Sequence, residues 1–220
     1  MTIRAIIFDA DNTLWETDKY VLSMIKETSY NLGLNVPDDL NIKAVQSKNL
    51  PFEDIFKELF VENGPVVLAA YRARAKEKGY SATLNGVDVV TSLNQTGKVL
   101  GIMTNRTQMI EERLSQCGYL REYFDFIYPP PSAEERKPHR NAYQKAIEYL
   151  DGKGISVGEI VVVGDHLDDY VSAKARELYF VAVLTGLTKK EDFVFQGLDD
   201  RFIVNDLSGL QKVLLELRGI

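Results

Sequence analysis

Residues 3–14 of the chain read IRAIIFDADNTL, an apolar run that ends in two aspartates, Asp9 and Asp11, separated by one alanine. In an extended segment, residues two positions apart point the same way, so both carboxylates are expected side by side just past the end of a strand. Two like charges that close repel each other, and each tends to raise the pKa of the other. This pattern therefore requires a cation, a shared proton or solvent as compensation.

Further apolar runs of similar length follow and predict a sheet. The predicted strands are 4–8, 99–103, 126–128, 160–163, 180–184 and 202–204. Most are apolar on both faces, which is typical of parallel strands that are covered by helices on both sides. Helical patterns separate them, at 87–95, 108–117, 140–150, 167–176 and 207–217. Repeated alternation of strand and helix predicts a doubly wound, Rossmann-like α/β fold with a parallel sheet.

The stretch from residue 19 to about residue 78 breaks this alternation. Its sequence shows the pattern of amphipathic helices and no convincing strand. At about sixty residues it is far longer than an ordinary connection between neighbouring elements. We interpret it as a helical cap, residues 18–79, inserted into a catalytic α/β core that comprises residues 1–17 and 80–220.

Composition narrows the function classes. Hydrophobic residues make up 45% and charged residues 26% of the chain, as in ordinary globular proteins, and the net charge of −6 argues against a general nucleic-acid binder. Cys117 is the only cysteine, which excludes an intramolecular disulfide and a cysteine-based zinc site. No apolar run approaches the ~18 residues of a membrane span, and the N-terminal residues lack a signal-peptide pattern. We therefore expect a cytoplasmic protein without a membrane partner.

Polar side chains follow four of the predicted strands. Besides Asp9 and Asp11, residues 104–106 read TNR, residues 164–169 read GDHLDD, and Lys137 follows the strand at 126–128. Ligands of open α/β sheets bind outside the carboxyl ends of the strands. We therefore expect carboxylates, a hydroxyl and an ammonium to converge at one edge of the sheet.

This ordered set of motifs resembles the haloacid dehalogenase superfamily, whose members are mostly magnesium-dependent phosphatases. DADNTL (residues 9–14) matches the first motif, DxDx[TV], and MTNR (103–106) resembles the second. RKPHRNAY (136–143) is similar to the third motif, and VGDHLDD (163–169) to the fourth, GDxxxD. The helical insertion resembles, in its position, the cap that many members carry after the first motif.

The resemblance implies a covalent mechanism. Asp9 would attack phosphorus and form an aspartyl-phosphate, and Asp11 would protonate the leaving alcohol and then activate water. Dividing a very slow hydrolysis into two steps is the general advantage of covalent catalysis.

The resemblance also implies a phosphate-binding set. Thr104 would hold a phosphate oxygen, with Asn105 beside it, and Lys137 would bind phosphate and offset the carboxylates. The backbone N–H groups that follow Asp9, beginning with Ala10, would stabilise the transferring group electrostatically.

For the metal, the resemblance implies Mg²⁺. Asp9, Asp165 and the backbone carbonyl of Asp11 would bind it, and Asp169 would orient or supplement the ligands, whereas Asp168 lies off the family spacing. A hard, oxygen-preferring cation is also what an aspartate-rich site without cysteine should select.

Three positions differ from the commonest family pattern. Ala10 lies between the two aspartates, Asn12 stands where many members have glycine, and His166 stands where serine is frequent. None of these differences removes a catalytic group. Because lone histidines seldom bind Mg²⁺, we expect a structural role for His166.

The favoured function is hydrolysis of a phosphomonoester of a small metabolite. A phosphomutase would keep all four motifs, so this alternative stays open. A dehalogenase would need neither a general acid nor magnesium, and Asp11 and the GDHLDD cluster argue against it. A non-catalytic phosphate-binding protein should have lost Asp9 or Asp11, and both are present.

Residues that contact the substrate are harder to predict. Trp15 and Tyr20 follow the catalytic loop closely enough to line an entrance, and Lys48, Arg72 or Arg74 could meet a second anionic group. We expect Trp15 and Lys48 to contribute to substrate binding, through a cap that admits substrate and excludes water.

Overall fold

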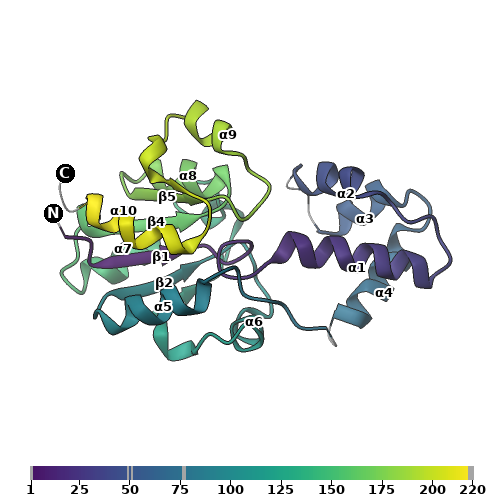
Figure 1. The fold of residues 1–220 in the computed structure, drawn as a ribbon, viewed down its shortest axis with the longest axis horizontal. Coiled ribbons are helices and arrows are strands. Elements are labelled where there is room, and N and C mark those ends of the chain that lie inside the picture. Colours follow the sequence, from purple (N-terminus) through teal and green to yellow (C-terminus); the bar gives the residue numbers. More distant parts are fainter. Residues whose placement is uncertain (1, 49, 51, 76–77, 218–220) are drawn as a thin grey trace. The chain divides into compact units, whose positions relative to one another are not determined.

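The computed structural model describes residues 2–48, 50, 52–75 and 78–217. The chain divides into two compact units, one formed by residues 1–16 and 81–220 and the other by residues 17–80. The first is an α/β unit and the second is helical (Figure 1).

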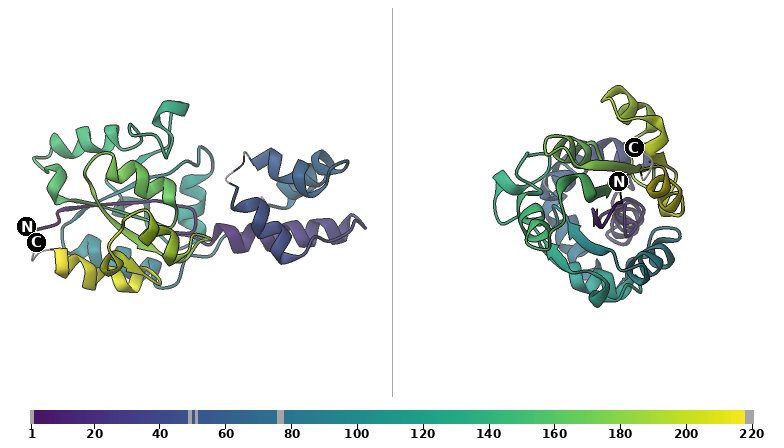
Figure 2. Two further views of the ribbon diagram at one scale, coloured as in Figure 1. Left: turned by 90° about the horizontal axis from the view of Figure 1, so that it is seen from above. Right: turned by 90° about the vertical axis from the view of Figure 1, so that its left-hand side faces the viewer.

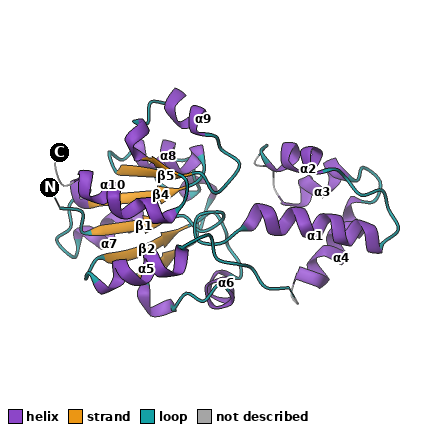
Figure 3. Cartoon of the chain, viewed as in Figure 1, coloured by secondary structure: helices purple, strands orange, loops and turns teal. Residues whose placement is uncertain are grey.

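The α/β unit is built on one sheet of six parallel strands. Its strands are β1 (Ala5–Phe8), β2 (Val99–Met103), β3 (Phe126–Tyr128), β4 (Ile160–Gly164), β5 (Tyr179–Val183) and β6 (Ile203–Val204). They lie in the order β3-β2-β1-β4-β5-β6, with every pair parallel (Figure 3). The chain first moves from β1 toward β3 and then from β4 toward β6, so the direction of winding reverses between β1 and β4.

Helices cover both faces of this sheet. They are α5 (Gly86–Gln95), α6 (Ile110–Gln116), α7 (Gln144–Asp151), α8 (Leu167–Lys174), α9 (Lys190–Phe195) and α10 (Leu210–Glu216). Helices α5 and α10 lie on one face, and α7 and α8 lie on the opposite face (Figure 2). The predicted doubly wound, Rossmann-like α/β fold is therefore confirmed.

The two-sided cover explains the composition of the strands. All four residues of β1 are buried, although successive side chains point to opposite faces of the sheet. Ala5 and Ile7 join Ile160 and Val162 of β4 in one core cluster with residues of α7 and α8. A strand that is buried on both faces needs apolar residues at every position, which is why the sequence shows runs instead of alternation.

The strand predictions agree with the structure to within one residue at each end. Among the helices, the segment predicted at 207–217 is a 3₁₀ turn (Leu207–Gly209) followed by α10, and Asp206 caps it by accepting a hydrogen bond from the Ser208 N–H at 2.7 Å. Helix α9 was not predicted from the sequence, because its six residues are too few to show a clear helical period.

The helical unit contains α1 (Thr17–Asn31), α2 (Asp39–Gln46), α3 (Phe52–Leu59) and α4 (Gly64–Ala75). Its extent, 17–80, is close to the predicted insertion, 18–79. Inside it, Tyr20 of α1 stacks on Tyr80 with the ring centroids 3.8 Å apart. Phe52, Phe56 and Tyr71 form edge-to-face pairs that join α3 to α4.

No helix among the described residues has the length and apolar character that are needed to cross a membrane.

Gly101 is a sensitive point of the sheet. It lies in β2 opposite Phe126 of β3, and a Cβ added to Gly101 would come within 2.1 Å of the Phe126 ring. We predict that Gly101→Ala lowers the free energy of unfolding by about 1–3 kcal/mol, because an overpacked core must shift. Urea denaturation followed by circular dichroism measures this.

Gly152→Ala is the matched control. Gly152 has an ordinary helical φ of −59° at the C-terminus of α7, and its added Cβ would meet nothing closer than 3.4 Å. We expect this variant to stay within about 0.5 kcal/mol of the parent protein. Equal losses in both variants would show that the contact with Phe126 is not the cause.

Candidate active site

Asp9 and Asp11 lie on the loop that follows β1. Backbone hydrogen bonds hold this loop in place. The Asp9 N–H donates to the Val163 carbonyl of β4 at 2.8 Å, and the Leu14 N–H donates to the Ala10 carbonyl at 2.9 Å. Asn12 adopts a left-handed conformation with φ of +59°. This explains the residue choice at position 12, since glycine and asparagine tolerate that region better than other residues.

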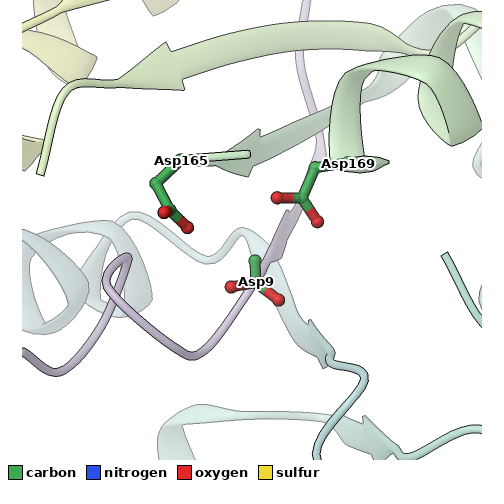
Figure 4. Close-up of side chains that lie close together, drawn as sticks. All are labelled: Asp9, Asp165 and Asp169. Carbon is green, nitrogen blue, oxygen red and sulfur yellow. The ribbon is translucent and has the colours of Figure 1, made fainter. Parts of the chain in front are cut away.

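Three carboxylates from two neighbouring strand ends come together at this edge of the sheet. Asp9 follows β1, Asp165 follows β4, and Asp169 lies in the first turn of α8. One oxygen of each lies within 4.8 Å of the others, and all three residues are buried. Figure 4 shows the three side chains pointing toward one another. Because β1 and β4 flank the point where the winding reverses, the cluster lies where ligands of such sheets bind.

Lys137 supplies positive charge inside this cluster. Its Nζ donates to Asp9 Oδ1, to Asp169 Oδ1 and, at 2.9 Å, to the Met103 carbonyl of β2. The three acceptors use the three protons of the ammonium. A buried charge without partners would be very costly, and here the lysine and the carboxylates compensate each other.

Burial and charge act in opposite directions on these groups. Burial, opposed by Lys137 and reinforced by Asp169 and Asp11, raises the pKa of Asp9 to about 7. Burial alone would lower the pKa of Lys137, but Asp169 and Asp9 outweigh it and hold that pKa well above its usual value. The lysine therefore stays charged, and the cluster holds three carboxylates against one ammonium, which contacts Asp9 and Asp169. This excess of negative charge favours binding of a cation.

Asn105 holds the backbone of Lys137. Its Oδ1 accepts a hydrogen bond from the Lys137 N–H at 2.9 Å, and its Nδ2 donates to the Lys137 carbonyl at 2.9 Å. The amide side chain thus positions the lysine, and phosphate binding by Asn105 stays a prediction. Thr104 is buried beside it, and its Oγ1 accepts from the Arg106 N–H at 3.1 Å.

Asp11 has different surroundings from Asp9. Arg106 forms a bidentate ion pair with it, from Nε at 3.0 and 3.2 Å and from Nη2 at 2.6 Å. The Trp15 indole also donates to Asp11 Oδ1, at 3.0 Å. Asp11 is partly exposed, whereas the three clustered aspartates are buried. Its side chain is absent from the group of carboxylates that could hold a metal, and the predicted metal contact would come from its backbone carbonyl.

Trp15 requires a correction. It was expected to line an entrance and contact substrate, but its side chain is fully buried and bonded to Asp11. The sequence shows where an aromatic residue lies along the chain, but not which way the loop turns it. Trp15 fits a role in orienting Asp11.

Two glycines allow the carboxylates to approach closely. A Cβ on Gly186, in the loop after β5, would lie 1.9 Å from Asp165 Oδ2, and a Cβ on Gly164 would lie 2.6 Å from Asp169 Oδ2. Thr13 also holds Asp165, by donating from Oγ1 to Oδ1 at 3.3 Å. Hard oxygen donors fixed in this way fit a divalent cation such as Mg²⁺.

His166 and Asp168 lie beside the cluster and contribute to the helix. His166 is the N-terminal cap of α8, where its Nδ1 accepts a hydrogen bond from the Asp168 N–H at 3.1 Å. The His166 N–H in turn donates to Asp169 Oδ2 at 3.2 Å. These contacts fit the structural role expected for His166.

The basic residues predicted for substrate binding lie in the helical unit. Lys48 pairs with Glu58, Arg72 with Glu53 and Arg74 with Glu27. All three basic side chains are well exposed, where such pairs contribute little. A contact of Lys48 with substrate stays a prediction.

Sequence reasoning missed Gly186 and the pairing of Arg106. Gly186 carries no motif, and it comes beside Asp165 only because β5 lies next to β4. Arg106 belongs to the TNR sequence after the second strand, but its contact with Asp11 spans 95 residues of sequence and depends on two loop conformations.

Comparisons with known proteins show the family of this chain. A model of the haloacid dehalogenase-like hydrolase family matches residues 6–183. Pyrophosphatase PpaX of Bacillus mycoides (strain KBAB4) is 24% identical over 225 residues, covering 100% of both chains. Pyrophosphatase PpaX of Halalkalibacterium halodurans is 26% identical over 219 residues, covering 97% of this chain and 98% of that protein.

Solved structures share the fold. CbbY from Rhodobacter sphaeroides in complex with phosphate has a TM-score of 0.67 at 22% identity, covering 96% of this chain and 100% of that one. A haloacid dehalogenase-like family hydrolase from Streptococcus pneumoniae has a TM-score of 0.72 at 20% identity, covering 96% and 97%. The family match confirms the predicted enzyme class, a hydrolase. Since it extends over most of the sequence, from β1 through β5, the chain belongs to the haloacid dehalogenase-like hydrolase family.

Proposed function

We propose that the protein is a Mg²⁺-dependent hydrolase of small phosphorylated substrates that acts through an aspartyl-phosphate on Asp9. The observation that supports this most directly is the cluster of Asp9, Asp165 and Asp169, with Lys137 bonded to Asp9 and Asp169 and with Asp11 on the same loop as Asp9. In this proposal the helical unit, residues 17–80, is the cap that governs access to the α/β core.

In the first step, Asp9 Oδ attacks phosphorus and the bond between phosphorus and the leaving oxygen breaks. The electron pair goes to the leaving oxygen, and Asp11, in its protonated form, donates the proton that this oxygen takes up. The Thr104 hydroxyl accepts from the Arg106 N–H and would donate its own hydrogen to a phosphoryl oxygen, while Lys137 places its positive charge beside Asp9 Oδ1. A carboxylate can approach an anionic phosphoryl group only if their charges are offset, and Lys137 contributes to this offset.

In the second step, water attacks phosphorus and the bond to Asp9 Oδ breaks. The Asp11 carboxylate takes one proton from the water, so the enzyme returns to its starting state with inorganic phosphate as product. Arg106 and the Trp15 indole orient Asp11 for both proton transfers.

The donor set fits Mg²⁺, with Asp9, Asp165 and the Asp11 backbone carbonyl as ligands and Asp169 as support. When bound, Mg²⁺ would supply Lewis-acid stabilisation of charge on the phosphoryl group. Thr13 holds Asp165 by a hydrogen bond, and Gly186 and Gly164 leave room for the Asp165 and Asp169 carboxylates.

The relatives support a proposal for the substrate class. The PpaX proteins are named as pyrophosphatases, and CbbY was solved with phosphate. We therefore propose a small substrate with a terminal phosphoryl group, either an ester or an anhydride.

Replacing the nucleophile tests the covalent mechanism. We predict that Asp9→Asn reduces hydrolysis of p-nitrophenyl phosphate to background, because an amide keeps the shape but loses the nucleophile. Excess EDTA should have the same effect on the parent protein. Asp199→Asn, in an exposed turn, is the control and should keep full activity. Normal turnover by Asp9→Asn, or in EDTA, would falsify the proposal.

Asp11→Asn tests the general acid. We predict a rate lower by about 10²–10⁴-fold, the usual contribution of proton transfer by a positioned group. The loss should be smaller for p-nitrophenyl phosphate than for an alkyl phosphate, because nitrophenolate leaves without needing a proton. Steady-state kinetics on both esters measure this, and equal losses would exclude Asp11 as the acid.

Gly186→Ala tests the metal site without relying on turnover. The added methyl group would displace the Asp165 carboxylate, so we predict that Mg²⁺ affinity falls by about 10-fold or more. Isothermal titration calorimetry with Mg²⁺ measures the dissociation constant. Gly152→Ala is again the control, and an unchanged constant in Gly186→Ala would mean that Asp165 does not bind the metal.

A further inference from the structure

The site contains a second cation besides Lys137, and it has a different place. Lys137 is buried between Asp9 and Asp169, where phosphorus would be attacked. Arg106 lies on the side of Asp11, and the two side chains are 22% and 29% exposed. One cation therefore accompanies the nucleophile, and the other accompanies the proposed acid.

Arg106 is fixed at both its main chain and its side chain. Its N–H donates to the Thr104 hydroxyl at 3.1 Å, and its guanidinium forms the bidentate pair with Asp11. Thr104 directly follows β2, the strand next to β1, so the guanidinium is attached to the same framework as the nucleophile. A cation held in this way has a defined position relative to the reacting phosphorus.

The position of Asp11 defines which part of the substrate meets Arg106. A general acid must lie within hydrogen-bond distance of the oxygen that it protonates, which is the leaving oxygen. The rest of the leaving group is bonded to that oxygen, so it comes close to Asp11 and to the groups that contact Asp11. The Arg106 guanidinium lies against Asp11, with Nη2 2.6 Å from Oδ1, and so it borders the space for the leaving group.

We propose that Arg106 recognises an anionic group on the leaving side of the substrate. Preferred substrates are then phosphoryl anhydrides or esters whose leaving group carries its own phosphate or carboxylate. This inference rests on the proposed function, because it uses Asp11 as the acid that marks the leaving side.

The chemistry of the guanidinium supports this assignment. It carries five N–H donors in a planar fork, so it can bind a second oxyanion while it keeps a bond to Asp11. Hydrogen bonds between ionised partners are roughly twice as strong as neutral ones. A neutral leaving group offers no such partner. The binding energy that Arg106 contributes is therefore specific to substrates with anionic leaving groups.

The experiment compares three small substrates that differ on the leaving side. The leaving group of inorganic pyrophosphate is phosphate. The leaving group of 2-phosphoglycolate is glycolate, which carries a carboxylate, and that of 2-hydroxyethyl phosphate is a neutral diol. We expect Arg106→Ala to lower kcat/KM for the anionic members by about 10- to 100-fold more than for the neutral member. Arg106→Lys should restore part of this preference, since it restores the charge without the fork.

Arg201→Ala is the matched control. Arg201 forms a similar bidentate pair with Asp199, with distances of 2.7, 3.1 and 3.2 Å, but in an exposed turn outside the site. This variant should leave kcat/KM unchanged for all three substrates. Thermal denaturation of each variant checks that the fold is kept.

A binding measurement separates recognition from orientation of Asp11. Methylenediphosphonate and methylphosphonate cannot be hydrolysed and differ by one anionic group. In calorimetry with Mg²⁺, Arg106→Ala should weaken the first by about 10- to 100-fold and change the second little. Equal effects on both ligands, together with equal losses on all three substrates, would overturn the inference and leave Arg106 as a positioning residue for Asp11. Absence of Mg²⁺-dependent turnover in the parent protein would overturn the proposed function itself.

Discussion

The buried contact of Lys137 with Asp9 and Asp169 is the interaction on which the rest of the site depends. Three buried carboxylates at one edge of a sheet repel each other, and removing one partner of a buried ion pair typically costs about 3–5 kcal/mol. Much of the surrounding structure serves to keep the ammonium in place. Asn105 binds its backbone on both sides, and the Met103 carbonyl takes its third proton. The burial that makes this cluster costly would also strengthen its electrostatic effect on the phosphoryl group in the proposed reaction.

Strand order turns residues that are distant in sequence into one site. The order β3-β2-β1-β4-β5 places the segments after these strands next to one another, although the sequence separates them by up to about 180 residues. Asp9 and Asp165 flank the reversal of winding, Thr104 and Lys137 approach from the β2 and β3 side, and Gly186 approaches from the β5 side. Only a parallel sheet brings all of these to the same edge, and such a sheet must be covered on both faces. The apolar strands and the polar strand ends are thus two consequences of one architecture.

The sequence was sufficient to predict the strands, the fold class and the clustered aspartates, because these depend on local patterns that repeat at each strand end. The residue pattern identifies a strand, and the end of the strand fixes the position of a carboxylate that directly follows it. The contacts of Asp11, Trp15 and Asn105 depend instead on how loops turn, which a pattern of residue types does not encode. Gly186 escaped notice for a further reason, since its importance lies in the absence of a side chain beside Asp165. Such a position becomes visible only when the neighbouring strand is known.

The different surroundings of Asp9 and Asp11 match the different tasks proposed for them. A nucleophile must keep one orientation and be shielded from water, and Asp9 is buried with a lysine at its oxygen. A residue that passes a proton to the leaving group and later takes one from water needs access to both, and Asp11 is accordingly half-buried. Its position is held from the outer side by Arg106 and Trp15 instead of by the buried cluster. The same sheet edge therefore supports two environments only two positions apart in the sequence, one buried and held by Lys137 and the other partly exposed and held by Arg106 and Trp15.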